Sequence, residues 1–512
     1  MKRLILGWIP FFAMTVLFMG TAGAVAAQGR VLRVVAPWKA KGLEPEKAGF
    51  IYVRMGCMEA LTTVDRHGRI VGQLAESWSV AEDKLTWTFI LRKGVKFHDG
   101  SLLTPEAVAV NLNRSIEKKG VLSRTPVTRV KPVGKDQVRI VTKQPFAPLP
   151  AYLAHYSCGI LSPKSFDLKG QVVDIIGTGQ FLLFASEGGK VFRFKAFPDY
   201  WGEKPRIAET SYTAVPKGET RGFMVEADQA EMGFTLSPMA ADKIRASGKA
   251  DIVAMTIPRT RQLMINCSSP FFSDVRVRRA MSLAINRPAI AKNILRHPDS
   301  AATQLLAPVI GLWHEPGLAQ LEYDPVKARA LLAEAGWNPG PQGILLKDGI
   351  PFKITLDTYS ARPMLPPVAT ALHAQLRQVG IDISIAIGES SNIPAKRKDG
   401  ALQMALLARN YGLIPDPIGN IAADFGPKPG HWGSMGWQSM KMNDLIEQYW
   451  EAFDQTEAKR IRKGILTILQ EELPVIPVSW YEHIVSVSKK VGGIHIDPFE
   501  LRSYVAGAYW VE

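Results

Sequence analysis

The stretch LTWTFILRKGVKFHDGS, residues 85–101, joins a strand-like pattern to a charged turn. Apolar Trp87, Phe89 and Leu91 alternate with more polar neighbours, and this alternation is typical of a strand with one buried face. The turn that follows, His-Asp-Gly at 98–100, contains residue types that also occur in catalytic and metal sites. Two interpretations are open for it, namely a site of chemistry or a structural turn that leads into the next element.

The residues after this turn predict a helix over 104–119. Thr104 is a favoured N-cap residue, and Pro105 suits the first helical position. Apolar side chains then recur at helical spacing on one face, at Val108, Leu112 and Ile116. A strand, a tight turn and a capped helix favour the structural interpretation of the His-Asp-Gly turn, in which Gly100 supplies backbone freedom.

Strand-like and helix-like segments alternate along the rest of the chain. Strands are expected at 30–37 and 190–197, and helices are expected within 273–295, 324–337 and 460–472. Residues 364–387 predict a helix, a stop at Gly380 and a strand, which is half of a βαβ unit. The mixed order predicts an α/β fold with sheets covered by helices.

Length and composition limit the possible classes of protein. A chain of 512 residues is too long for one compact core, so two or more lobes are expected. The formal net charge is +15, carried by basic residues that are scattered and form no basic-aromatic recognition motif, so nucleic acid is a poor candidate partner. A solvated basic surface, an anionic membrane face and an anionic ligand remain open, and the charge favours a carboxylate-rich ligand.

The first 27 residues match a cleaved signal peptide. Lys2 and Arg3 precede an apolar run, and Ala24-Val25-Ala26 fits the cleavage pattern of small residues. A permanent membrane anchor is the alternative, but the run is short and contains a proline. Because no cysteine precedes Cys57, we expect an exported, periplasmic protein that is not lipid-anchored.

No sequence motif indicates a catalytic or metal-binding function, although the absence of motifs does not by itself exclude an enzyme. Three cysteines, Cys57, Cys158 and Cys267, are too few for a disulfide framework, and we expect all three to be buried apolar residues. We find no H-E-x-x-H, C-x-x-C, phosphate-loop, dinucleotide or G-x-S-x-G motif, and no two histidines lie three or four residues apart. The sequence therefore predicts a protein that is not an enzyme and has no intrinsic cofactor.

The order of these segments resembles a known family. LAESWSVAEDKLTWTFILRKGVKFHDGSLLTPEAVAVNLNRS closely resembles the signature of the family 5 solute-binding proteins of ABC importers, the peptide- and nickel-type periplasmic receptors. The resemblance continues, in the order of the family, through GTGQFLL, PDYWGEKPRI, INCSSPFFSDVRVRRAMSLAINR, YDPVKARALLAEAGW and ELPVIPVSWY. These blocks cover nearly the whole chain after the signal peptide.

The resemblance implies a two-lobed periplasmic-binding-protein fold of the large, cluster C type. Lobe I would comprise residues 28–255, with an extra subdomain at about 76–175, and a return at 485–512; lobe II would comprise 256–484. Two crossing strands, expected within 254–265 and 478–488, would form the hinge. The resemblance also implies a monomer that traps a ligand between the lobes and delivers it to an ABC permease with its ATPase subunits.

The ligand is predicted from one stretch, RNYGLIPDP at 409–417. Peptide receptors of the family place an aspartate there for the free amine of the peptide, whereas this chain has Leu413 or Ile414. The stretch is closer to the nickel-receptor pattern, in which metal arrives as a chelate with a small polycarboxylate or opine-like molecule. Nickel or another divalent metal would then be part of the bound chelate.

The resemblance also suggests site residues. Tyr411 takes the aromatic position, and His431 is the candidate metal ligand if an insertion is assumed. The first-lobe arginine of nickel receptors is missing, since Cys158 or Gly159 stands there, and Arg54 and Arg409 are candidate replacements. Tyr52 and Met55 are further candidates for the cleft, although each of these side chains has an alternative in the core, at the surface or in an ion pair.

Two alternative functions remain. An oligopeptide or dipeptide receptor of the same importer family would use the same fold, as would a sensory or chaperone-like protein that hands ligand to a membrane receptor.

Overall fold

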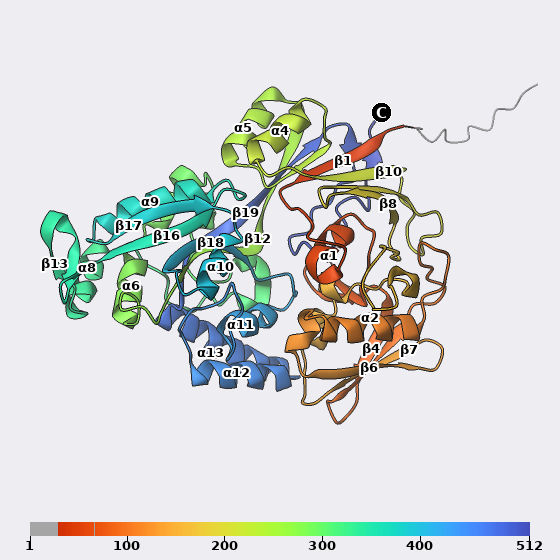
Figure 1. Cartoon of the computed structure of the whole chain (residues 1–512), viewed down its shortest axis with the longest axis horizontal. Coiled ribbons are helices and arrows are strands. Elements are labelled where there is room, and N and C mark those ends of the chain that lie inside the picture. Colours follow the sequence, from red (N-terminus) through yellow and green to blue (C-terminus); the bar gives the residue numbers. More distant parts are fainter. Residues whose placement is uncertain (1–28, 66) are drawn as a thin grey trace, which may run out of the picture. The chain divides into compact units, whose positions relative to one another are not determined.

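A mixed sheet of ten strands passes through the computed structural model, which describes residues 29–65 and 67–512 (Figure 1). The predicted signal peptide lies outside the described residues. The ten strands are β1 (Val31–Ala36), β8 (Phe181–Glu187), β9 (Val191–Ala196), β10 (Glu209–Ala214), β11 (Met232–Phe234), β12 (Ala250–Ile265), β16 (Lys353–Tyr359), β17 (Asp382–Gly388), β18 (Met404–Asn410) and β19 (Val475–Ser488). Their order across the sheet is β17-β16-β18-β12-β19-β11-β1-β10-β9-β8.

Two long antiparallel strands, β12 and β19, occupy the middle of this sheet. Their pairing runs from Ala250 opposite Ser488 to Met264 opposite Val475, with shifts of register on the way. The end of β12 pairs with β18, whereas the end of β19 pairs with β11. Both strands therefore pass from one half of the sheet to the other, and the predicted crossing segments lie within them. The lobe boundaries proposed from the sequence stay a prediction.

The first half of the sheet contains β11, β1, β10, β9 and β8, and we call these strands with their helices the first half. Alternation of buried Phe192 and Phe194 with exposed Arg193 and Lys195 in β9 confirms the predicted strand. The helices of the first half are α1 (Pro45–Arg54), α4 (Gly218–Glu226) and α5 (Pro238–Ser247). Helix α4 contacts β11 and β19, and α5 contacts β12, so both lie against the crossing strands.

A separate four-stranded antiparallel sheet lies beside the first half (Figure 1). Its strands, in the order β4-β5-β7-β6, are β4 (Ala75–Val80), β5 (Thr86–Leu91), β7 (Gln137–Thr142) and β6 (Val127–Val133). Trp87, Phe89 and Leu91 are all buried, which confirms the predicted face of β5. Helix α2 (Pro105–Glu117) packs on β6 and β7 and begins where predicted, because the Thr104 hydroxyl accepts a hydrogen bond from the Ala107 N–H at 3.2 Å.

The His-Asp-Gly turn is part of this architecture. The ring of His98 bonds to the backbone, with Nε2 2.9 Å from the Gly179 carbonyl oxygen and Nδ1 3.2 Å from the Gly177 nitrogen. The Asp99 carboxylate accepts hydrogen bonds from the Ser101 N–H and hydroxyl at 3.0 and 2.5 Å. Gly100 has a φ of +82°, a conformation that glycine adopts without strain. The structural interpretation of the turn is confirmed.

The second half contains β18, β16 and β17 with the remaining long helices. Strands β16 and β17 are parallel and are joined by α9 (Leu365–Arg377), so the predicted βαβ connection is confirmed. The other helices are α6 (Val275–Leu283), α7 (Arg287–Ala289), α8 (Pro325–Glu334), α10 (Asn392–Lys398), α11 (Ile418–Phe425), α12 (Met440–Glu451) and α13 (Gln455–Glu472). The short elements that remain are α3 (Leu149–Tyr152), β2 (Thr62–Val64), β3 (Ile70–Gly72), β13 (Asn338–Pro339), β14 (Leu345–Lys347), β15 (Ile350–Pro351), β20 (Val491–Gly492) and β21 (Tyr509–Trp510).

The cysteines behave as expected from the sequence. Cys57, Cys158 and Cys267 are free and buried. Burial raises the pKa of the Cys57 and Cys158 thiols to about 12 and that of Cys267 to about 11. Among the described residues, the helices include none with the length and apolar character needed to cross a membrane.

Replacing the buried ring of β5 should destabilise the fold. Phe89→Ala removes a fully buried side chain and should lower the free energy of unfolding by about 3–5 kcal/mol. Phe223→Ala is the matched control, because that ring is 55% exposed and its loss should change the free energy by less than about 0.5 kcal/mol. Urea denaturation followed by circular dichroism measures both, and equal losses would contradict the assigned core.

The buried imidazole of His98 should make stability depend on pH. Burial lowers the pKa of His98 from 6.5 to about 4, so between these values the unfolded chain binds the proton that the folded chain refuses. The stability supplied by neutral His98 is present above about pH 6.5 and is lost as pH falls towards 4. The difference in the free energy of unfolding between the wild type and His98→Gln should therefore shrink, by at most about 3 kcal/mol, as the pH falls from 6.5 to 4. Denaturation at pH 4.5, 5.5 and 7 tests this, and parallel pH profiles for the two proteins would refute it.

A cationic cavity beside the crossing strands

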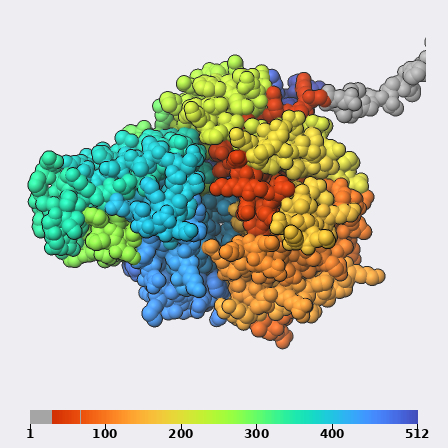
Figure 2. Space-filling model, in the orientation of Figure 1, coloured from red at the N-terminus to blue at the C-terminus, as the bar shows by residue number. Residues whose placement is uncertain are grey.

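A cavity of about 250 Å³ opens beside β12, between residues of the first and second halves. Figure 2 shows the N-terminal segments, coloured red, next to the cyan residues of the second half. The lining residues are Pro37, Trp38, Arg259, Tyr359, Ala361, Arg362, Ser390, Leu407, Ala408, Arg409, Asn410 and Trp432. Because Pro37 and Trp38 follow β1 whereas the others lie on β12 or in the second half, a ligand here would contact both halves.

Aromatic rings supply the apolar surface of the cavity. Trp38, Tyr359 and Trp432 all line it. The guanidinium of Arg54 lies 4.6 Å from the centre of the Trp38 ring, and that of Arg362 lies 5.7 Å from it. Aromatic rings beside cations suit a small solute that is negatively charged and also has a planar or apolar surface.

Three arginines surround the ring of Tyr481 on the crossing strand β19. The guanidinium groups of Arg261, Arg362 and Arg259 lie 4.3, 5.1 and 5.3 Å from the ring centre. Arg362 also donates a hydrogen bond of 3.3 Å to the Tyr481 hydroxyl. Although burial alone would raise the pKa of Tyr481, the positive charges of Arg362, Arg261 and Arg259 outweigh burial and lower it.

One buried carboxylate faces this cluster. Glu500 accepts hydrogen bonds from Arg54 Nη2 at 3.0 Å, Arg259 Nη2 at 2.6 Å and Asn410 Nδ2 at 2.9 Å. Burial opposes ionisation, but the charges of Arg259 and Arg54 lower the pKa of Glu500 to about 2, so it is ionised at neutral pH. In the described part of the chain, Arg261 and Arg362 form no ion pair with a carboxylate. Positive charge therefore exceeds negative charge around the cavity.

Several donors of the cluster have no partner among the residues that the structure describes. Buried nitrogen atoms without a hydrogen-bond acceptor include Nε and Nη1 of Arg259, Nε of Arg261 and Nε of Arg54. Burial lowers the pKa of Arg261 to about 10, but all of these groups remain charged at neutral pH. Buried donors of charged groups are costly when they lack an acceptor, and an anionic ligand would supply one.

Two of the arginines expected from the sequence lie at or near the cavity. Arg409 lines it, and its guanidinium makes a bidentate ion pair with Asp424 at 2.6 and 2.7 Å. Arg54 is buried behind Trp38 and bonds to Glu500. The structure thus places Arg54 and Arg409 near Trp38, but the guanidinium groups of both form ion pairs with carboxylates of the protein itself.

The other predicted site residues lie elsewhere. Tyr411 is completely buried and donates its hydroxyl hydrogen to Gln262 Oε1 at 3.0 Å, and it is not among the residues that line the cavity. Tyr52 and Met55 are completely buried in the core of the first half. His431 is exposed, next to Trp432 of the cavity wall. Their roles in ligand binding stay predictions.

A preformed metal site was not expected, and His431 is the candidate ligand for a chelated metal. Among the described residues, no group of three or more histidine, cysteine, aspartate or glutamate side chains could hold a metal ion.

Most residues of the cavity were not predicted from the sequence. Arg259 and Arg261 could have been noticed, because two arginines interrupt the predicted crossing segment 254–265 at alternate positions, where apolar residues are the norm. Trp38 and Arg362 follow strands in loops without a recognisable local pattern. Glu500 lies far from its partners along the chain, and nothing in its neighbourhood indicates its role.

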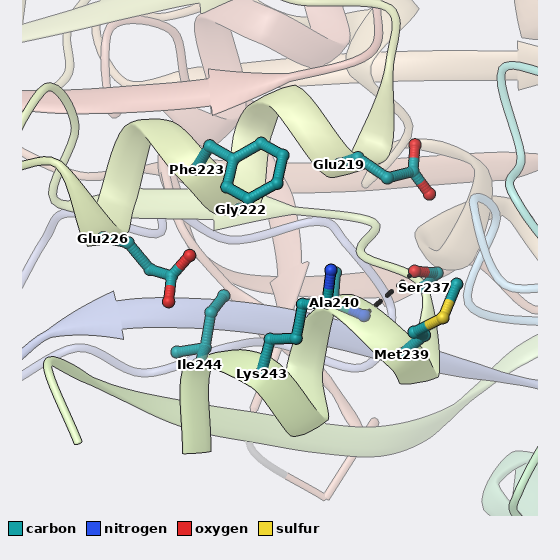
Figure 3. Close-up of a pocket in the computed structure, with 9 residues that line it drawn as sticks. All are labelled: Glu219, Gly222, Phe223, Glu226, Ser237, Met239, Ala240, Lys243 and Ile244. Atoms are coloured by element: carbon teal, nitrogen blue, oxygen red, sulfur yellow. Dashed lines mark hydrogen bonds between the residues drawn. The ribbon is translucent and has the colours of Figure 1, made fainter. Parts of the chain in front are cut away.

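A second hollow lies between α4 and α5 (Figure 3). Phe223, Met239 and Lys243 are among the residues that line it. It measures about 30 Å³, which is too small for a chelate or a peptide, whereas the cavity beside β12 is about eightfold larger. Hollows of about 830 and 550 Å³ lie elsewhere, each within one half of the molecule. The cavity beside β12 is the candidate ligand site because residues of both halves line it, among them the buried Arg259 and Arg362.

Comparison with known proteins identifies the family of this chain. The family described as bacterial extracellular solute-binding proteins, family 5 middle, matches residues 69–431. The chain belongs to this family. The nickel-binding periplasmic protein of Escherichia coli (strain K12) is 27% identical over 457 residues, 86% of each chain. The glutathione-binding protein GsiB of the same strain is 26% identical over 454 residues, also 86% of each chain.

A solved structure shows the same fold. NikA from Brucella suis in complex with Fe(III)-EDTA superimposes with a TM-score of 0.84 at 25% identity, over 94% of this chain and 100% of that chain. The predicted family and the two-lobed α/β fold are confirmed. This family 5 protein is a solute-binding protein and not an enzyme, because the matching family consists of solute-binding proteins.

The arginines around Tyr481 give a direct test of the cluster. Arg362→Met removes the positive charge nearest to the tyrosine hydroxyl and should raise the pKa of Tyr481. Absorbance of tyrosinate during alkaline titration measures this, with Tyr481→Phe identifying the contribution of Tyr481. Arg460→Met, a change at an exposed arginine of α13, is the control. Superimposable titrations of the wild type and Arg362→Met would contradict the cluster.

Proposed function

We propose that this family 5 protein is the periplasmic substrate-binding protein of an ABC transporter and captures a small anionic solute in the cavity beside β12. Residues 1–27 would direct export, and the loaded protein would deliver its solute to a membrane permease driven by ATPase subunits. The observation that carries the proposal is the excess of buried guanidinium groups over carboxylates around Tyr481.

The favoured ligands are a nickel or similar metal chelate with a polycarboxylate, or an opine-like anion. Both carry carboxylates that the free donors of Arg259 and Arg362 could bind through charge-assisted hydrogen bonds. A volume of about 250 Å³ fits a small solute. Support also comes from NikA of Brucella suis, whose structure contains the carboxylate chelate Fe(III)-EDTA. If a metal is present, His431 remains the candidate for a direct bond.

An oligopeptide receptor is the alternative within the same family. A peptide bound by its N-terminus needs a carboxylate for its ammonium group, but the residues that line the cavity include no aspartate or glutamate. The buried Asp424 is held by Arg409. These contacts favour an anion over a peptide. A sensory or chaperone-like protein would bind the same ligand, and it differs in needing no permease for its function.

Capture would work through closure of the two halves on the ligand. Trp38 belongs to the first half, whereas Tyr359, Arg362 and Trp432 belong to the second half. A ligand that contacts all of them stabilises the arrangement in which the halves are close, because only that arrangement supplies every contact.

Ligand binding can be measured through the cavity tryptophans. Calorimetry and intrinsic fluorescence with succinate, citrate, nickel citrate, Fe(III)-EDTA and a mixed tripeptide pool should show binding of a polycarboxylate or its chelate and not of the peptides. Arg362→Met should weaken that binding ten- to a hundredfold, the cost of a charged hydrogen bond. Arg460→Met is the control, since this exposed arginine lies on α13 and pairs with Glu457.

Two outcomes would overturn the proposal. Tight binding of peptides without binding of polycarboxylates would assign the protein to the peptide receptors. Equal affinities of the wild type and Arg362→Met would show that the cationic cavity is not the site. Comparison of solute uptake by cells with and without an ABC permease would separate a transport receptor from a sensory protein.

A further inference from the structure

The loop that carries Glu500 is built to direct its side chain inward. The Asp497 carboxylate accepts hydrogen bonds from the backbone N–H groups of Phe499, Leu501 and Arg502 at 2.9, 2.6 and 3.0 Å. These bonds fix a tight loop in which Glu500 has a φ of +61°. Such a left-handed conformation is uncommon for glutamate and costs free energy, so the surrounding contacts must compensate for it.

The Glu500 carboxylate joins three elements that are distant in sequence. Arg54 belongs to α1, Arg259 to the crossing strand β12 and Asn410 to the end of β18. The glutamate side chain is completely buried, and those of Arg54 and Arg259 are nearly so. Two of the three partners, Arg259 and Asn410, line the ligand cavity. Glu500 thus lies directly behind the cavity wall and holds two of its polar side chains.

Glu500 also sets the charge of the cluster. Arg54, Arg259, Arg261 and Arg362 all lie around the hinge, and Glu500 is the carboxylate that pairs with the first two. The Glu500 carboxylate accepts a hydrogen bond from Arg259 Nη2, a donor that a ligand carboxylate could otherwise bind. In the described part of the chain, the Nε and Nη1 atoms of Arg259 have no hydrogen-bond partner, which leaves them free for a ligand.

We infer that Glu500 is a positioning residue and built-in counter-ion, which orients Arg259 and Asn410 toward the ligand and limits how much negative charge the cavity accepts. The inference deepens the proposed function and rests on it for the identity of the ligand as an anion. Glu500, which does not itself line the cavity, would thus determine how strongly the protein prefers one anion over another of different charge.

The effect of charge can be separated from that of position. Glu500→Gln keeps the shape and one acceptor oxygen but adds one net positive charge to the cluster. This should favour trianionic citrate over dianionic succinate, raising the ratio of their affinities by about tenfold for an added charge within several ångströms of the ligand. Glu500→Asp keeps the charge but withdraws the carboxylate, and it should weaken the binding of both anions alike.

Glu457→Gln is the matched control for charge. Glu457 lies exposed on α13, so the same change of net charge occurs far from the cavity lining and should leave the citrate-to-succinate ratio unchanged. If Glu500→Gln has the same ratio as the wild type while the wild type binds both anions, the inference fails and the proposed function stands.

A second experiment needs no knowledge of the ligand. Glu500→Gly removes the carboxylate and accepts the left-handed backbone, leaving a space between Arg54 and Arg259. Sodium formate or acetate should fill that space and raise the melting temperature by several degrees relative to sodium chloride of equal ionic strength. In the wild type and Glu457→Gly the Glu500 carboxylate fills this space, so the difference between the salts should be clearly smaller than in Glu500→Gly.

The two experiments distinguish the two claims. Failure of every polycarboxylate to bind the wild type, together with rescue of Glu500→Gly by formate, would refute the proposed ligand class and support the positioning role. Absence of any difference between formate and chloride would refute the role of Glu500 as a counter-ion. If Glu500→Gly does not fold in chloride, recovery of folded protein on refolding in formate replaces the melting temperature as the measurement, and no recovery counts against the inference.

Discussion

The antiparallel pairing of β12 with β19 is the interaction on which the rest of the structure depends. These strands lie in the middle of the ten-stranded sheet, and β18 joins one side of the pair while β11 joins the other. The halves are therefore connected by continuous backbone hydrogen bonding through this pair of strands. Side chains on the crossing strands are necessarily close to both halves, which makes this region suited to sense whether a solute lies between them.

The protein places charge in this region at considerable cost. Arg259, Arg261 and Tyr481 lie on the crossing strands and are almost completely buried. Apolar residues at these positions would avoid the loss of hydration that buried guanidinium groups suffer. The buried guanidinium groups are therefore better explained by ligand binding than by stability. The same reasoning explains why the lowered pKa of Tyr481 and the very acidic Glu500 occur side by side, since both respond to the same positive field.

The fold could be read from local patterns, whereas most of the site could not. The faces of β5 and β9, the Thr104 cap and the connection through α9 depend on neighbours within a few residues, and each was predicted correctly. The cavity depends on loops that meet only after folding, such as those of Trp38 and Arg362. The family pattern directed attention to the stretch around Tyr411, where Arg409 and Asn410 line the cavity but Tyr411 itself is completely buried. The partners of Glu500 are separated from it by up to 446 residues.

The three thiols have a practical consequence for following domain motion. Each is buried and holds its proton at neutral pH, so it is a poor nucleophile toward maleimides under native conditions. Cysteines introduced at exposed positions, for example at Phe223 on α4 and Met440 on α12, would react selectively without removal of the native ones. A donor and an acceptor dye at this pair of positions would report the opening and closing of single molecules by energy transfer in the otherwise unaltered chain.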